Sequence, residues 1–209
     1  MKIHQLIFQG CALVILTALP SFAETNNKVI LVPGDNLFPL KCETIQDSID
    51  ANDKLAPPGT LHNSASRYDS YSVKTDPGNI VFFELTTPKS DYSNFMPQLT
   101  TQMVDKKSGA ILSSASAVLP KSILEAWYFS RKATETTNRN LYISSATSGG
   151  NYQLRIAYAR PSSNLSESQI EAAIGMNYLG SSFWDYFTGS SSSSSSSSHR
   201  VDMNALCIN

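Results

Sequence analysis

The residues of this chain best suited to chemistry are oxygen ligands. Acidic and amide side chains gather after position 42 and again near position 69, and they are Glu43, Asp47, Asp50, Asn52, Asp53 and Asp69. Calcium takes about six to eight oxygen ligands of this kind. The spacing matches no EF-hand loop, so a solvated acidic turn is the alternative. We predict a calcium site built from five of these residues: Asp47, Asp50, Asn52, Asp53 and Asp69.

The motifs of common hydrolases are missing from the sequence. It has three histidines, and neither Gly-x-Ser-x-Gly nor His-Glu-x-x-His occurs. Residues 34–37 resemble the start of one class of serine esterases, but the nucleophile position holds Asn36, whose amide cannot attack a carbonyl. The histidines and cysteines are too few for a zinc site. A pair of carboxylates such as Asp69 and Glu84 is the remaining catalytic alternative.

Two groups of aromatic side chains fit a recognition surface. Strand alternation places Trp127 and Phe129 on one face, and core packing is the alternative to ligand binding for Trp127. The second group, with Trp184 and Tyr186, lies beside a run of serines. Exposed rings suit sugar stacking or a protein contact, so these four residues are our candidates for ligand binding.

The first 23 residues are typical of a secretory signal peptide. Lys2 precedes a mostly apolar stretch over residues 6–19, and small residues lie three and one positions before a cut after Ala23. The stretch is too short and too polar to cross a membrane. We therefore expect a secreted or periplasmic protein.

Cleavage would remove Cys11 and leave Cys42 and Cys207, which lie near the two ends of the mature chain. In an oxidising compartment two thiols most simply form one disulfide. We predict a bond between Cys42 and Cys207, with two unpaired cysteines as the alternative.

The formal net charge is −1, and charged residues make up only 16% of the chain. No basic stripe is available for phosphates, so nucleic acid is not an expected partner. The low charge and the many polar residues suit an extracellular β-protein.

Short alternating segments separated by turn residues predict a mainly β fold, a single antiparallel β-sandwich of jelly-roll type. A polar segment at 44–54 is expected to hold one helical turn, and residues 76–79 to form a β-turn with Gly78. The expected strands cover residues 29–32, 70–74, 80–86, 98–104, 110–113, 124–131, 141–145 and 152–158.

The last fifty residues differ in character. Ser166 and Gln169 form a capping box that predicts one short helix. Nine serines at 190–198 predict a flexible tether. The expected divisions are a signal peptide at 1–23, the sandwich at 24–160, a short helix with an aromatic segment at 161–189, the tether at 190–198 and a tail at 199–209.

A series of motifs runs through the sandwich. The segment 69–73 (Asp-Ser-Tyr-Ser-Val) is followed by a glycine turn and the apolar strand at 77–83, then by 99–105 with Gly109, and finally by 150–156 (Gly-Asn-Tyr-Gln-Leu-Arg-Ile). This order resembles the bacterial pre-peptidase C-terminal domain, a small β-sandwich appended to secreted peptidases, over roughly residues 50–158. The resemblance implies a non-catalytic module that supports secretion, folding or surface binding. Calcium at its amino-terminal edge is known in related domains that bind collagen. No peptidase precedes the module here, so we expect it to act alone.

We therefore expect a secreted, non-catalytic β-sandwich that binds a protein or a glycan, with no cofactor other than calcium. A small secreted hydrolase with a carboxylate site and a component of a cell-envelope assembly are the alternatives.

Overall fold

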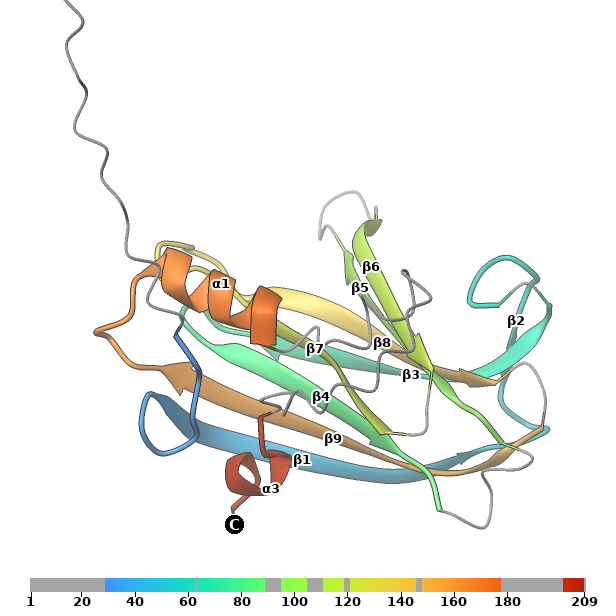
Figure 1. Ribbon diagram of the computed structural model, residues 1–209. Coiled ribbons are helices and arrows are strands. Elements are labelled where there is room, and N and C mark those ends of the chain that lie inside the picture. Colours follow the sequence, from blue (N-terminus) through green and yellow to red (C-terminus); the bar gives the residue numbers. More distant parts are fainter. Residues whose placement is uncertain are drawn as a thin grey trace, which may run out of the picture.

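Two antiparallel sheets packed face to face form the body of the protein (Figure 1). The structure, a computed structural model, describes residues 29–62, 64–88, 95–104, 111–118, 121–145, 148–177 and 201–208. The first sheet contains, in spatial order, β1 (Leu37–Ile49), β9 (Gly150–Pro161), β4 (Ile80–Thr86) and β7 (Lys121–Tyr128). The second contains β2 (Lys54–Ala56), β3 (Ser66–Thr75), β8 (Thr137–Ser145), β5 (Gln98–Val104) and β6 (Ile111–Val118).

The strands pair as nested hairpins. The innermost pair is β5 with β6, and around it β4 pairs with β7, β3 with β8, and β1 with β9. Folding this long hairpin over itself places β4 beside β9 and β5 beside β8. That order is the jelly roll, and the predicted antiparallel sandwich is confirmed.

The space between the sheets is filled by alternate residues of the central strands. Val81, Phe83 and Leu85 of β4 point into it, as their spacing predicts, and meet Leu154 of β9 and Leu141 of β8. Each of these side chains is at most 1% exposed. The alternation seen in the sequence therefore sets the inward face of each strand.

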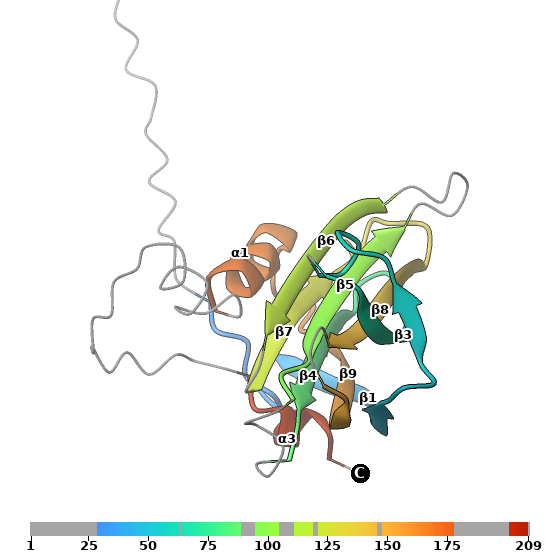
Figure 2. The ribbon, with the colours of Figure 1, turned by 90° about the vertical axis from the view of Figure 1, so that its right-hand side faces the viewer.

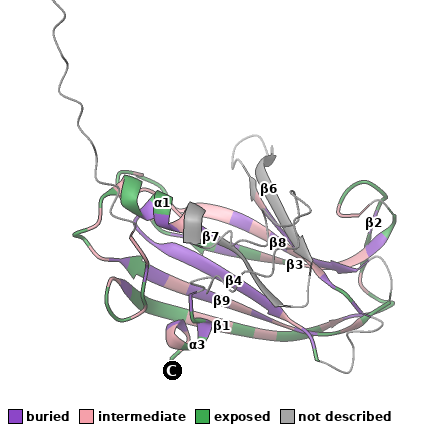
Figure 3. Cartoon of the chain, in the orientation of Figure 1, coloured by how far each residue is buried: buried purple, intermediate pink, exposed green. Residues whose placement is uncertain are grey.

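A second core lies on the outer side of the first sheet. Ile80 and Phe82 of β4 are buried there by α1 (Glu167–Asn177) and by the C-terminal tail, residues 201–208, which contains α3 (Met203–Leu206). Figure 2 shows α1 and α3 together on this side of the molecule, away from β3 and β8. Strand β4 is consequently buried on both faces, as its colour in Figure 3 shows.

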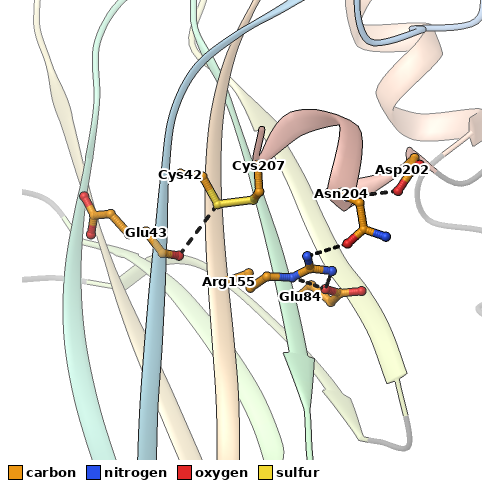
Figure 4. A network of polar contacts seen from close by, with 7 residues as sticks. All are labelled: Cys42, Glu43, Glu84, Arg155, Asp202, Asn204 and Cys207. Atoms are coloured by element: carbon orange, nitrogen blue, oxygen red, sulfur yellow. Dashed lines mark hydrogen bonds and ion pairs between the residues drawn. A yellow bond between two sulfur atoms is a disulfide. The ribbon is translucent and has the colours of Figure 1, made fainter. Parts of the chain in front are cut away.

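The C-terminal tail is fixed to the first sheet by a covalent bond and by polar contacts. Cys42 of β1 and Cys207 form a disulfide with Cα atoms 5.1 Å apart, which confirms the predicted pairing. Arg155 of β9 donates to Glu84 Oε2 (2.6 Å) and to Asn204 Oδ1 (2.8 Å), so it joins a central strand to α3 (Figure 4).

Some expectations were wrong in detail. The helical turn expected at 44–54 does not form, because β1 continues to Ile49 and its Ile45 and Ile49 pack into the core between the sheets. The helix after Ser166 is confirmed, and the described C-terminal residues contain the four-residue helix α3 as well. The turn at Gly78 is confirmed, with φ +81°. The signal peptide and the serine tract lie outside the described residues.

Candidate functional site

Most of the acidic residues predicted from the sequence meet where the edges of the two sheets approach each other. Asp47 lies on β1 and Asp69 on β3, and Asn52 and Asp53 lie in the turn that joins β1 to β2. With Tyr71 and neighbouring residues they line a surface hollow of about 380 Å³. We call this region the acidic edge.

Two tyrosine hydroxyls connect the carboxylates of the acidic edge. Tyr152, which is 3% exposed, donates to Asp69 Oδ2 at 2.6 Å. Tyr71 donates to Asp47 Oδ2 at 3.1 Å, and the two hydroxyl oxygens lie 2.5 Å apart. Because the Tyr152 ring is held in the core, it fixes the position of the Asp69 carboxylate.

Burial and charge change the protonation of this network. Burial raises the pKa of Asp69, and the negative charges of Asp53, Asp47 and Asp50 raise it further, against the hydrogen bond from Tyr152. Burial also raises the pKa of Tyr71 to about 12. Asp69 therefore keeps its proton to a higher pH than an exposed aspartate does.

The predicted calcium ligands do not share one coordination sphere. Asp53 Oδ2 accepts from the Asp50 backbone N–H at 2.6 Å, and Asp50 Oδ1 accepts from the Asn52 N–H at 2.6 Å. These carboxylate oxygens accept hydrogen bonds from the backbone of the turn that contains them, while Asp47 and Asp69 accept hydrogen bonds from tyrosine hydroxyls. Within the described ranges no group of three or more acidic, histidine or cysteine side chains is arranged to hold a metal. Calcium binding stays a prediction from sequence.

The carboxylate pair suggested for a hydrolase is not brought together. Asp69 contacts Tyr152, whose ring lies between the sheets. Glu84 bonds to Arg155 on the opposite side of the first sheet, beneath α3. The sheet separates the two carboxylates, so they cannot act on one substrate. Asn36, at the position of an esterase nucleophile, instead accepts from the Val32 N–H at 2.7 Å and stabilises a turn.

A serine and a histidine meet elsewhere, a contact that the sequence does not indicate. His62 Nε2 lies 2.9 Å from Ser144 Oγ. Ser144 is 0% exposed, so no substrate can reach its hydroxyl. Among the described residues no carboxylate bonds to His62 to orient it. The contact anchors the loop between β2 and β3 to β8 and is not a catalytic pair.

The structure describes two of the four candidate aromatic residues. Trp127 and Phe129 are half-buried and in contact, with ring centroids 5.7 Å apart, and the buried Arg139 guanidinium lies 4.7 Å from the centre of the Trp127 ring. This environment agrees with core packing and not with an open ligand platform. Trp184 and Tyr186 lie outside the described residues.

The second sheet carries a polar surface that is not apparent from the sequence. In the register of β3, β8 and β5, the residues that alternate with the core residues share one outward face, here named the open face. Its side chains are Tyr68, Ser70, Ser72, Lys74, Asn138, Asn140, Tyr142, Gln98 and Gln102, together with Ser144 and Thr100, which are buried. Lys74 is the single charged residue in this set, and the exposed Lys54 of the neighbouring strand β2 lies opposite Tyr68. Tyr68 and Ser70 also line the hollow of the acidic edge, so the two regions adjoin.

The alternation of Ser70 and Ser72 with Tyr71 and Val73 in the sequence indicates one strand of this face. The sequence does not indicate that Asn140, Tyr142 and Gln102 lie beside that strand on the same face, because the pairing of strands cannot be predicted from neighbouring residues alone.

No helix of the described segments is long and apolar enough to span a membrane. No protein-family model matches the chain, and a search of curated proteins finds no match to its sequence.

Proposed function

We propose that this protein is a secreted, non-catalytic β-sandwich that binds a protein or glycan partner through the open face. The difference between the two sheets carries the proposal. The first sheet is covered on its outer side by α1 and the C-terminal tail, whereas Ser70, Ser72 and Lys74 on the second sheet are exposed. A sheet face that bears tyrosines and amides is equipped to bind another molecule.

The chemistry of the described residues supports binding rather than turnover. The serine of the His62–Ser144 contact is buried, and Asp69 and Glu84 lie on opposite sides of a sheet. The proposed accessory role resembles that of pre-peptidase C-terminal domains.

The proposal of export rests on the predicted signal peptide. Amino-terminal sequencing of the protein recovered outside the cytoplasm should find that the chain starts after Ala23.

Binding through the open face is tested with a panel of immobilised polysaccharides and extracellular proteins. We expect at least one of them to retain the mature chain, and Tyr142→Ala to abolish retention. Phe38→Ala is the matched control, because Phe38 is an aromatic residue, 44% exposed, on β1 of the other sheet. No retention by any member, or equal retention of the Tyr142→Ala variant, would contradict the proposal. Hydrolysis of a peptide, ester or glycoside that one substitution abolishes would favour the hydrolase alternative instead.

A further inference from the structure

We infer that the ligand of the open face is a neutral glycan, an uncharged chain of hydroxyl-bearing sugar units. The inference rests on the proposed function and specifies the ligand that the face would bind. It is drawn from the charge, the hydrogen-bonding groups and the aromatic rings of that face.

The open face carries few charges. Lys74 is the single charged side chain of its three strands, Lys54 of the edge strand β2 lies opposite Tyr68, and carboxylates gather at the adjoining acidic edge. A nucleic acid or a sulfated polysaccharide needs several cations to replace its counterions. A charged protein surface needs opposite charges across the contact. Two separated lysines do not meet either need, and removing water from an uncharged partner costs the least free energy.

The hydrogen-bonding groups of the face match those of sugar hydroxyls. An amide side chain both donates and accepts, as a hydroxyl does. Register places Ser72, Asn140 and Gln102 in one row across three strands. The next row contains Ser70 and Tyr142. With neighbouring strands about 4.8 Å apart, each row presents donors and acceptors at regular steps to an extended chain.

Two tyrosine rings give the face an apolar component that a sugar ring can contact. The rings of Tyr68 and Tyr142 meet edge to face, with centroids 5.8 Å apart and planes at 65°. Asn140 Nδ2, on the same strand, lies 3.5 Å from the Tyr142 hydroxyl oxygen. Both rings are half-buried and held by neighbours, so binding costs little side-chain entropy.

The occupant favoured by this chemistry is a glycan rather than a protein. Protein contacts are centred on large apolar or arginine side chains that enter pockets. The strand residues of the open face include no arginine and no large aliphatic side chain. Exposed aliphatic side chains lie outside this set and include Leu40 on β1, Leu55 on the edge strand β2 and Met96 just before β5.

Affinity gel electrophoresis of the disulfide-bonded mature chain tests the inference. The neutral probes are hydroxyethyl cellulose, laminarin, dextran and galactomannan, and the charged probes are alginate, heparin and chitosan. We expect retardation by at least one neutral probe, with an affinity that stays constant between about 0.05 and 0.5 M NaCl. Asn140→Ala and Tyr142→Ala should each weaken this binding about tenfold or more, while Phe38→Ala should leave it unchanged.

Variants must be compared as folded proteins. Tyr142→Phe, which keeps the ring and removes the hydroxyl, replaces Tyr142→Ala if the latter does not show the wild-type melting transition, and a smaller loss of affinity is then expected. Retardation by none of the neutral probes would overturn the inference, and so would neutral binding that survives both Asn140→Ala and the Tyr142 variant. Binding of only a protein or a charged polysaccharide, lost in the Tyr142 variant, would overturn the glycan assignment but leave the proposed function in place.

Discussion

Replacing Cys207 by serine should release the C-terminal tail from the first sheet. The tail buries Val201, Met203 and Leu206, which contributes roughly 5–9 kcal/mol at about 1.5–3 kcal/mol per side chain. Ordering residues 201–208 costs roughly 8–16 kcal/mol at about 1–2 kcal/mol per residue. The apolar contacts at best balance the cost of ordering the tail, and we therefore expect docking to depend on the covalent bond.

The disulfide contributes the missing stabilisation through the unfolded chain. It joins residues 165 positions apart, and closing a loop of that length is worth about 5 kcal/mol in the chain-entropy description. In Cys207→Ser we expect the free energy of unfolding, measured by urea titration, to fall by about 3–5 kcal/mol. The amides of Leu206 and Cys207, which bond to Asp202 and Met203, should lose protection in hydrogen exchange.

Ile208→Ala is the matched control for this experiment. Its side chain is 76% exposed, so both the unfolding free energy and the exchange protection should remain at the wild-type values. Addition of reductant should reproduce the Cys207→Ser result in the wild type and change nothing further in the variant. A Cys207→Ser protein with protected tail amides and unfolding free energy within about 1 kcal/mol of wild type would refute the reasoning.

Further predictions concern the core and the acidic edge. Because the folded state raises the pKa of Asp69 above 3.8, it binds more protons than the unfolded state in the window just above that value, so stability should fall as pH rises through it. Asp69→Asn should remove this fall in a series of urea titrations, and an unaltered pH profile would count against the assignment. Gly150→Ala would place a Cβ 2.6 Å from the Phe95 ring, and we expect a loss of about 1–3 kcal/mol on chemical unfolding. Phe82→Ala should cost about 3–5 kcal/mol by the same measurement, and a cost near zero would mean that α1 and the tail do not pack on β4. If calcium binds, as the sequence predicts, a chelator should lower the melting temperature of the protein. Equal melting temperatures with and without chelator would contradict the predicted calcium site.

The central strands show most clearly what can be predicted from the sequence alone. Alternation in 80–86 correctly predicts that Phe83 faces one way and Phe82 the other, since the side-chain period of a strand is local. It cannot predict that both faces are buried, which depends on α1 and on a tail that follows more than a hundred residues later. The polar segment at 44–54 misled for the same reason, because its pairing with β9 is non-local.

The sequence by itself determined the class of fold and the Cys42–Cys207 cross-link. Strand periodicity and turn chemistry are properties of neighbouring residues, and Cys42 and Cys207 have no competing partner if Cys11 leaves with the predicted signal peptide. Tertiary structure alone decided which polar groups meet. It separated Asp69 from Glu84, joined Asp69 to Tyr152, and aligned three strands into the open face. Register and sheet packing set these contacts, and both are fixed by the whole chain at once.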